Sequence, residues 1–489
     1  MQQNIQKILI LLFLFTCGIN AQKSLSLSEA VQIAETNNFE IKRFEEKVKQ
    51  KEKQNLSAIG NFLPKVNVSW SFTHLDEPMD IDLTPIRTAM IKMQAGTQTE
   101  LANIYGIMQG AAPLTDMQKL QLTQQNAAGL NKMLPEFITH AKKQDYQTAT
   151  ITAIQPLFLG GKLIAAKKYA KTEVNSANFD LQKKRDEIIS VTTDIYLKIV
   201  LLEELVSVRK NVVDGITKHK VKAEKALKNG LANKYDLLRA EVALADAKKN
   251  LDNDLNKLAT AYDALKNNLG ITDDSIKIKI TDKFFEVNFE EINDIAYYKN
   301  EAESHQPILK MIASKKEAAH QNTWIKRSKF LPQVAGFGKY EMYPEYLSLF
   351  EPRWAVGVKV SLSIFNGFKD YLDLETASYL EDEVNYLEKD TKQKIGLLVN
   401  KYYNEIKSAV NTYKNSKKVI ELAKENLKLN NKRFDIGLGT SLEHIDAQLL
   451  LEKNQLEASQ ALYNYFSSKA KLLNICGKPN EFINFWNSK

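Results

Sequence analysis

The stretch KYDLLRAEVALADAKKNLDNDLNKLATAYDALKNNLG, residues 234–270, decides the fold class. Leucine recurs in it every seven residues and alanine stands between the leucines, at Leu237, Leu244, Leu251, Leu258 and Leu265, and at Ala240, Ala247 and Ala261. A seven-residue repeat places these side chains along one seam of an α-helix. The stretch therefore predicts a long helix that packs against other helices.

The segment before this stretch predicts a second, longer helix. Residues 161–229 contain no proline and only one internal glycine, Gly215. Apolar residues recur in it three or four positions apart, at Ile188, Val191, Ile195, Ile199, Leu202 and Val206. This spacing gives one apolar helix face, and at 1.5 Å per residue such a helix is about 100 Å long. Glycine tolerates the left-handed conformation of a helix stop, so we expect Gly230 to turn the chain back and Gly270 to end the second helix.

The same unit is written twice in the chain. The segments that begin at Ala34 and Phe62 resemble those at Ala302 and Phe330, with one offset of 268 residues. A second set shares an offset of 207 residues, and it pairs Phe158, Gly160, Gly230 and Gly270 with Phe365, Gly367, Gly437 and Gly477. The offsets differ by 61 residues, so the first copy carries an insertion of about that length near residues 74–145. We interpret the insertion as a loop excursion, in part helical, with Thr84 as a helix N-cap and Pro85 as the first helical residue.

This organisation predicts the following division of the chain. The expected parts are a signal peptide at 1–21; a first repeat at 22–270, with a β-hairpin at 65–158 and a long helical pair at 160–270; a linker at 271–288; a second repeat at 289–477, with a β-hairpin at 333–365 and a long helical pair at 367–477; and a C-terminal tail at 478–489.

The N-terminus predicts export. Lys7 precedes an apolar run of eight residues, and Ala21 stands at the expected cleavage edge. A helix that crosses a bilayer needs roughly 20 apolar residues, so a permanent anchor is the weaker interpretation. Cys17 leaves lipid attachment open as an alternative. Once the signal is removed, Cys476 is the only cysteine, and no intramolecular disulfide can form.

Short alternating segments between the helical parts predict strands. Val66, Val68, Trp70 and Phe72 alternate with small polar residues, and Trp354, Val356, Val358 and Val360 do the same further on. Their partners are the segments 146–157 and 333–343, so each chain supplies four strands. Four strands cannot close a barrel, and open sheet edges are not tolerated in lipid. Three chains would give 12 strands, which is within the size range of outer-membrane barrels. An ordinary soluble sheet with one buried face is the alternative.

Composition and motifs argue against other classes of protein. The formal charge of +8 is the balance of 67 basic and 59 acidic residues along the whole chain, which is typical of a solvated surface and not of a nucleic-acid site. None of the six histidines forms a pair with metal-ligand spacing, and no phosphate loop or nucleophile turn is present. We expect no enzyme, cofactor or metal. For His444 two interpretations stay open, a threefold ring in a trimer and a surface or interface histidine.

Four short motifs carry a family resemblance. QPLFLGGK at 155–162 and LSIFNGFK at 362–369 resemble the strand-to-helix junctions of the TolC-type outer-membrane efflux family. NGLANKYD at 229–236 and IGLGTSLE at 436–443 resemble its periplasmic helix turns. With the duplicated layout, the resemblance extends over about residues 25–477.

The resemblance implies a mixed α and β protein made mainly of long helices. Three chains would form a 12-stranded barrel in outer-membrane lipid and a periplasmic tunnel of 12 helices. It implies a passive, gated exit duct of a tripartite efflux or type I secretion system. The expected partners are two more copies of the chain, a periplasmic adaptor and an inner-membrane pump of the RND or ABC class. A structural rod that spans the envelope and a stand-alone porin are the competing functions, and conductance would separate them.

The resemblance also implies site residues at the helix turns. The family places acids of the second turn around the pore axis, and the matching residues are Glu443 and Asp446. Asp236 matches the acid of an intrachain lock, together with Phe434. Phe434 and Gly439 stand where the best-known members carry a tyrosine and an arginine, so the lock cannot be identical.

The same turns are the expected docking surface for the adaptor. In each copy a glycine is followed by a leucine, Gly230 with Leu231 and Gly437 with Leu438.

Overall fold

The computed structural model describes residues 23–135, 138–230, 232–273, 275–286, 292–347 and 351–488. The expected signal peptide at 1–21, with Cys17, and the expected docking residue Leu231 lie outside these ranges. The chain divides into two compact units. The helical unit comprises the residues up to Ala58, Ile164–Lys326 and the residues from Tyr371 onward, and the strand unit comprises Ile59–Leu163 and Arg327–Asp370.

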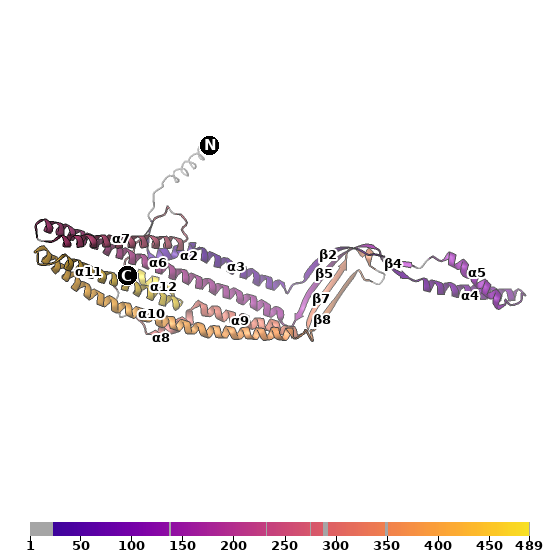
Figure 1. Cartoon of the computed structure of the whole chain (residues 1–489). Helices are drawn as coiled ribbons and strands as arrows, with labels where there is room; N and C mark the ends of the chain where they lie inside the picture. Colours follow the sequence, from indigo (N-terminus) through magenta and orange to yellow (C-terminus); the bar gives the residue numbers. More distant parts are fainter. Residues whose placement is uncertain are drawn as a thin grey trace, which may run out of the picture. The chain divides into compact units, whose positions relative to one another are not determined.

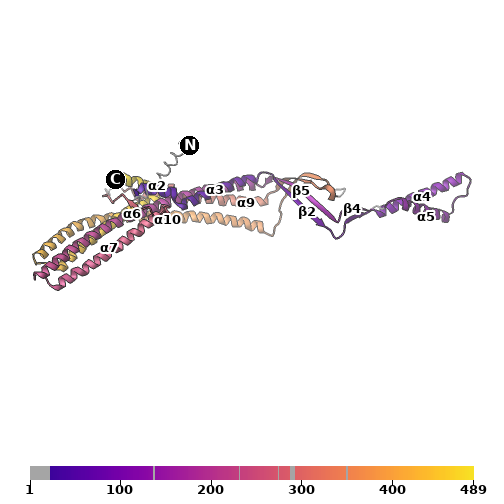
Figure 2. The ribbon, with the colours of Figure 1, turned by 90° about the horizontal axis from the view of Figure 1, so that it is seen from above.

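Four long helices form the body of the helical unit. They are α6 (Lys162–Lys228), α7 (Lys234–Asn268), α10 (Lys369–Asp435) and α11 (Ser441–Ile475). α6 and α10 have 67 residues each, and the four helices run alongside one another (Figures 1 and 2). Gly215 lies inside α6 and does not interrupt it. It has no side chain, which leaves room for α11: a Cβ there would lie 3.2 Å from the side-chain oxygen of Gln448. The predicted fold class, mainly long helices with a smaller β part, is confirmed.

The heptad seam of α7 is only partly covered within one chain. Its alanines, Ala240, Ala247 and Ala261, are buried, whereas the leucines other than Leu265 are half-buried. Small side chains thus make the closest contacts between helices. Much of the leucine surface remains available to a neighbour.

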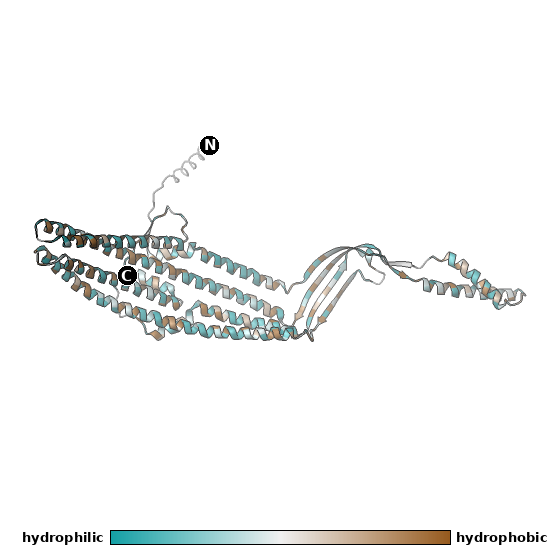
Figure 3. Ribbon diagram, viewed as in Figure 1, coloured by the Kyte–Doolittle hydropathy of each residue, from teal (hydrophilic) through white to brown (hydrophobic). Residues whose placement is uncertain are grey.

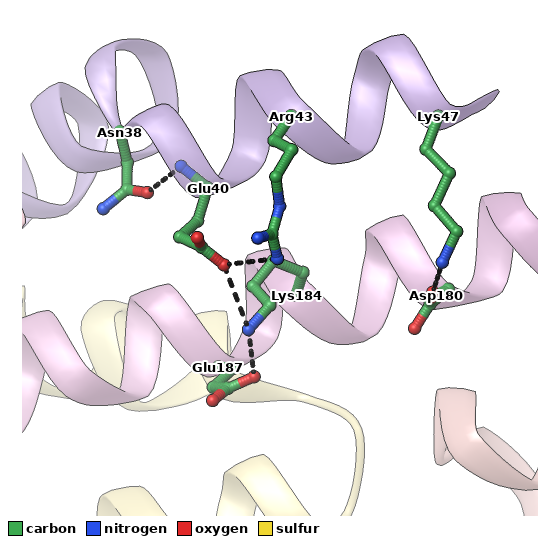
Figure 4. Close-up of polar contacts among 7 residues, drawn as sticks. All are labelled: Asn38, Glu40, Arg43, Lys47, Asp180, Lys184 and Glu187. Carbon is green, nitrogen blue, oxygen red and sulfur yellow. Dashed lines mark hydrogen bonds and ion pairs between the residues drawn. The ribbon is translucent and has the colours of Figure 1, made fainter. Parts of the chain in front are cut away.

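Shorter helices line the long ones. They are α2 (Leu27–Asn37), α3 (Phe39–Gly60), α8 (Ile295–His305) and α9 (Pro307–Arg327). Ion pairs join α3 to α6 (Figure 4). Lys47 lies 2.7 Å from Asp180, and Lys184 lies 3.8 Å from Glu40 and 2.9 Å from Glu187 of its own helix. Partly exposed pairs of this kind contribute at most about 1 kcal/mol each, so they align the two helices more than they stabilise them.

Two stretches that we expected to be a linker and a tail enter the core. In the first, β6 (Ile278–Ile280) pairs in parallel with β1 (Lys23–Leu25). In the second, α12 (Pro479–Asn487) buries Phe482 and Trp486. The Trp486 indole donates to the Asp282 carboxylate at 2.9 Å, and this carboxylate also accepts from the Leu27 backbone at 3.0 Å. The residues after each repeat therefore close the core and do not merely connect it.

The strand unit holds one four-stranded antiparallel sheet. Its strands are β2 (Lys65–His74), β5 (Asp145–Leu159), β7 (Gln333–Glu341) and β8 (Trp354–Ser361), in the order β2-β5-β7-β8. The β5–β7 ladder joins the hairpins of the two repeats side by side, which leaves β2 and β8 as the sheet edges.

Apolar and polar residues alternate along the strands of this sheet (Figure 3), so its two faces differ in polarity. On one face the edge strands expose Val66, Val68, Trp70 and Phe72 of β2, and Trp354, Val356, Val358 and Val360 of β8. On the other face polar residues oppose one another across β2 and β5, as Asn67–Thr152, Ser69–Thr150 and Ser71–Thr148. The apolar face is thus left exposed like the polar one, whereas a sheet in water buries its apolar face against a core.

Glycine is required at the junction between β5 and α6. Gly160 has a φ of +60°, and a Cβ on it would lie 2.6 Å from the Ser328 carbonyl oxygen. Gly367, its counterpart in the second repeat, has a φ of +55° with open space around it. The two junctions share a backbone conformation but not the same surroundings.

The insertion in the first repeat is a helical hairpin on a β-ribbon, where we expected a partly helical loop. Its elements are β3 (Met79–Asp82), α4 (Thr84–Met108), α5 (Asp116–Met133) and β4 (Ile138–Lys142). α4 begins at Thr84, one residue earlier than predicted. The reason is that the Asp82 carboxylate accepts a hydrogen bond from the Thr84 backbone at 2.8 Å and so satisfies the helix start.

Candidate functional site

The turns between the long helices have the geometry that their glycines predict. Gly230 and Gly437 have φ values of +72° and +73°. After α10, the Leu438 N–H donates to the Arg433 carbonyl at 2.8 Å and the Gly437 N–H donates to the Phe434 carbonyl at 3.1 Å. These bonds satisfy the last carbonyls of the helix and leave the Leu438 side chain 71% exposed.

A capping box opens each returning helix. Asn233 and Asp236 cap α7 reciprocally, and Thr440 and Glu443 cap α11 in the same way. Two of the predicted site residues, Asp236 and Glu443, thus have a local role in starting their helices.

Asp236 also joins the two repeats. Its second carboxylate oxygen accepts the Ser441 backbone N–H at 3.2 Å, at the start of α11. Asp236 and Phe434 line one cavity of about 210 Å³ at the turns, together with Lys222 and Asp435. Lys222 of α6 and Asp435 of α10 lie 2.6 Å apart and close this side of the cavity. Four helices are therefore tied together at the turns.

Phe434 contacts a residue that the sequence analysis did not single out. Its ring lies 4.5 Å from the ring of His219 on α6. His219 in turn stacks on His444 of α11, with ring centroids 4.0 Å apart and an interplanar angle of 18°. The His219 Nε2 lies 2.7 Å from the Ser441 hydroxyl. His444 is thus buried within its own chain and is neither a pore-lining ring nor a surface residue.

Burial sets the charge state of this histidine pair. Only 2% of His219 and 3% of His444 is exposed. Loss of solvation lowers the pKa of His219 to about 3, with the neighbouring His444 as a further cause, and lowers the pKa of His444 to about 4. In the described part of the chain, His219 Nδ1 and both ring nitrogens of His444 lack a hydrogen-bond partner. Both rings are therefore neutral near pH 7. Protonation of either ring would place a charge in a buried site and destabilise this arrangement.

Gly439 shows why the residue at this position is small. A Cβ on it would lie 3.0 Å from the Phe434 backbone nitrogen and 3.1 Å from the Arg433 carbonyl carbon. The turn is packed too closely against the end of α10 for the arginine that the best-known family members carry.

The two expected constriction acids lie on the first turns of α11. The Thr440 backbone N–H donates to Glu443 at 3.0 Å, and Arg433 lies 3.4 Å from its other oxygen. The Thr440 hydrogen bond is the main cause that lowers the pKa of Glu443 within a single chain. Asp446 is exposed. The acids are three positions apart, so they lie on one side of the helix.

An ion network braces the helices above the turns. Arg209 of α6 pairs with Asp254 of α7 at 3.1 Å and with Glu452 of α11. The residues Asp254 and Glu452 are 4% and 5% exposed. Lys257 adds a second cation at 2.9 Å from Asp254. The two cations of this network offset the cost of burying two carboxylates. The pairs of Arg209 also hold three helices in register.

Two other features are absent from the described ranges. Within them, no group of three or more histidine, cysteine or acidic side chains is arranged to hold a metal ion. The helices described there include none that is long and apolar enough to cross a membrane.

Comparisons with known proteins agree with the duplicated layout. The family model described as outer membrane efflux protein matches residues 30–271 and 299–478. A comparison with curated protein sequences finds no match.

Solved structures share the fold. A membrane protein from Pseudomonas aeruginosa matches with a TM-score of 0.71 and 14% identity, covering 92% of this chain and 90% of that one. VceC from Vibrio cholerae matches with a TM-score of 0.70 and 16% identity, over 92% and 96% of the two chains. The open state of MtrE from Neisseria gonorrhoeae matches with a TM-score of 0.65 and 14% identity, over 93% and 89%. Since the family model covers both repeats, this chain belongs to the outer membrane efflux protein family, and it is a transport channel of the cell outer membrane that extends into the periplasm, not an enzyme.

Proposed function

We propose that three copies of this chain form a 12-stranded barrel and a helical tunnel, and that they act as a passive, gated exit duct of a tripartite efflux or type I secretion system. The observation that carries the proposal is the sheet β2-β5-β7-β8, which exposes an apolar face and has two free edges. The energy for transport comes from an inner-membrane pump of the RND or ABC class.

The free edges favour a barrel shared between chains. An unpaired backbone group in lipid costs several kcal/mol, and each edge strand presents a row of them. Pairing of β2 of one chain with β8 of the next removes both edges, and three such junctions close the ring. The apolar face then meets lipid and the polar face meets the lumen, where the Ser71 and Thr148 hydroxyls lie 2.7 Å apart.

The helical unit supplies matching surfaces for a tunnel. The half-buried leucines of α7 form a heptad seam, which packs against a further helix in a coiled coil. Neighbouring chains provide that helix in a trimer.

The turns are the gate in this proposal. Threefold symmetry converges Glu443 and Asp446 of three chains on the tunnel axis and makes the narrowest, cation-attracting section. Asp236, with its bond to Ser441, and Phe434, with its contact to His219, hold the closed arrangement within each chain. The related channel MtrE has been captured in an open state, which supports a fold that opens and closes.

The turns are also the docking surface for a periplasmic adaptor. Leu438 is 71% exposed after Gly437, and Ile436 beside it is 69% exposed. Gly230 and Leu231 stand at the corresponding turn of the first repeat. Two apolar side chains on an exposed turn fit the apolar ends of a helical hairpin.

Conductance tests the duct. The purified protein is reconstituted in a planar bilayer, and single-channel steps are recorded before and after both constriction acids are replaced by their amides. A gated duct gives small, cation-selective steps. An envelope-spanning rod gives no steps, and a stand-alone porin gives a wide resting pore. Either of these outcomes contradicts the proposal.

Adaptor docking is tested by crosslinking in cells. Leu438→Asp, combined with Leu231→Asp, is expected to abolish crosslinks to the adaptor because a desolvated carboxylate is costly in an apolar contact. Leu438→Met is the matched control and retains an apolar side chain of similar size. Unchanged crosslinking and export in the Asp variant, in a stable trimer, would show that the adaptor binds elsewhere.

A further inference from the structure

The helical hairpin of the insertion exposes an apolar helix face that its own chain does not cover. Two sides of α4 can be distinguished by burial. One side is buried against α5 at Ile91, Ala95, Thr99 and Asn103. The other side is a stripe of apolar residues, interrupted by Thr97, and its large members are between 46% and 78% exposed: Ile86, Met90, Met93, Leu101, Ile104 and Met108. We call this set the α4 stripe.

The α4 stripe faces away from α5. Met93 and Leu101 each stand two residues before a buried position, Ala95 and Asn103. Since each residue advances an α-helix by about 100°, two residues correspond to about 200°, which is nearly the opposite side. No rearrangement of α5 over the same face can therefore cover the stripe.

The polar residues between α4 and α5 bond to one another within the hairpin. Arg87 donates to Asn131, to the Leu134 carbonyl at 2.8 Å and to the Pro135 carbonyl at 2.9 Å, which fastens the end of α5. Further along, the Thr99 hydroxyl accepts from α5, and Glu100 lies 3.1 Å from Lys119. Ile91 and these polar residues thus hold the hairpin together, and the side chains of the α4 stripe are left for another partner.

The spacing of the stripe is that of a helix–helix interface. With Thr97 included, the steps from Ile86 to Met108 are 4, 3, 4, 4, 3 and 4 residues. This is an 11-residue pattern of about 3.67 residues per turn, which keeps one face of a helix against other helices over six turns. A helix that lies on a lipid surface instead carries basic residues beside its apolar face. α4 has only Arg87 and Lys92 as basic residues, and Arg87 is bound to α5.

The ribbon that carries the hairpin continues the membrane sheet. The last pair of the β2–β5 ladder is His74 with Asp145, and the next bond runs from the Leu75 N–H to the Gln144 carbonyl at 2.8 Å. β3 and β4 then extend the pairing. In a shared barrel, three such ribbons leave the same end around one axis.

We propose that the α4 stripe packs against the α4 stripes of two further copies of this chain, so that the three insertions form a parallel helical bundle beyond the barrel. This inference rests on the proposed trimer. Symmetry makes the three α4 helices parallel and lets identical faces meet at the axis. The barrel holds them at an effective concentration on the order of millimolar, which favours association of even a modest apolar interface.

The test compares neighbouring cysteines in the full-length protein in outer membranes. Leu101→Cys places a thiol in the stripe, and Ala102→Cys, its matched control, places an exposed thiol about 100° around the helix. The native Cys476 is buried and does not contribute crosslinks between chains. Mild oxidation is expected to link two chains of the trimer at Leu101→Cys at least tenfold faster than at Ala102→Cys. Met93→Cys and its exposed neighbour Gln94→Cys repeat the comparison in case the first variant fails to fold.

Three outcomes overturn the inference. Equal rates at both positions show that the stripes do not meet. Disulfides to other proteins assign the stripe to a different partner. The third outcome assigns the α4 stripe to the membrane. In that case the Leu101→Cys thiol is protected from a water-soluble maleimide, and a lipid-soluble quencher quenches a label attached there. Trimer formation is read separately, from migration in unheated detergent gels and from conductance. A loss of the trimer in the unsubstituted protein contradicts the proposed duct, whereas an intact trimer without stripe contacts contradicts only this inference.

Discussion

Acid on the periplasmic side is expected to open the helix turns, because burial keeps His219 and His444 neutral at a pH at which exposed rings would be protonated. In the proposed opening, α6 separates from α11 and both rings become exposed to water, where their pKa returns to about 6.5. The charged groups nearby partly oppose each other: Lys222 lowers the pKa of both rings, and Asp435 raises it. Burial is the larger cause, so the direction of the shift is set by desolvation.

The direction of the pH effect on opening follows from the lowered pKa values. Above pH 6.5 both rings are neutral in the closed and the open arrangement, and pH has no effect on the balance. Below pH 6.5 the open arrangement binds protons that the closed one refuses, until the pH reaches the closed-state values of about 4 and about 3. At pH 5 each ring destabilises the closed arrangement by about 2 kcal/mol, which is a shift toward opening of roughly 30-fold per ring.

Single-channel recording measures this shift. The pH on the side of the helix turns is stepped from 7.5 to 5, and the open probability is compared among three proteins. The unsubstituted channel is expected to open more at pH 5, and His219→Gln combined with His444→Gln is expected to lose the response. His305→Gln, an exposed histidine of the same unit, is the control. An equal response in the double variant would refute the reasoning and assign the pH dependence to other groups.

Three further predictions concern stability and selectivity. Gly160→Ala is expected to destabilise the trimer more than Gly367→Ala. Both substitutions place a side chain at a positive φ, which costs about 1–2 kcal/mol, but only the new Cβ at position 160 meets a carbonyl oxygen. Thermal melting measures the difference, and equal melting temperatures would contradict it. Arg209→Met is expected to cost about 3–5 kcal/mol, since it removes the cation that pairs with the buried Glu452 carboxylate and leaves the buried Asp254 with Lys257 alone, and chemical denaturation reports the loss. Replacing Glu443 by Gln together with Asp446 by Asn is expected to weaken cation selectivity and block by multivalent cations while the trimer stays intact; unchanged reversal potentials would place the constriction elsewhere.

The predictable part of this fold is the part encoded in local periodicity. Seven-residue leucine spacing and a proline-free run were enough to predict long helices, and α6 and α7 follow them. Alternation of apolar and polar residues predicted the strands of the four-stranded sheet in the same way. Both patterns repeat within a few residues, so they can be identified without knowledge of any distant contact.

The candidate site was predictable only where a residue acts close to its own position in the chain. The family resemblance of the turn motifs marked Asp236 and Glu443, which the structure places in capping boxes, and the glycine pattern marked Gly437, which stands in a helix stop. His219 and Ser441 are 222 residues apart, and nothing in either neighbourhood indicates that they meet. Their contact depends on the register between α6 and α11, which the close approach at Gly215 helps to set.

The sequence by itself thus determined the helices, the strands, the duplication and the turns, because each is written in residues that are neighbours along the chain. The tertiary structure alone decided that β6 completes a sheet with β1, that α12 closes the core, and that the insertion is a hairpin with its apolar face turned outward. It also decided that His444 is buried against His219 and does not line a pore. These features arise from the packing of segments that are distant in sequence, where the fit of side chains between elements, and not the pattern within one element, selects the arrangement.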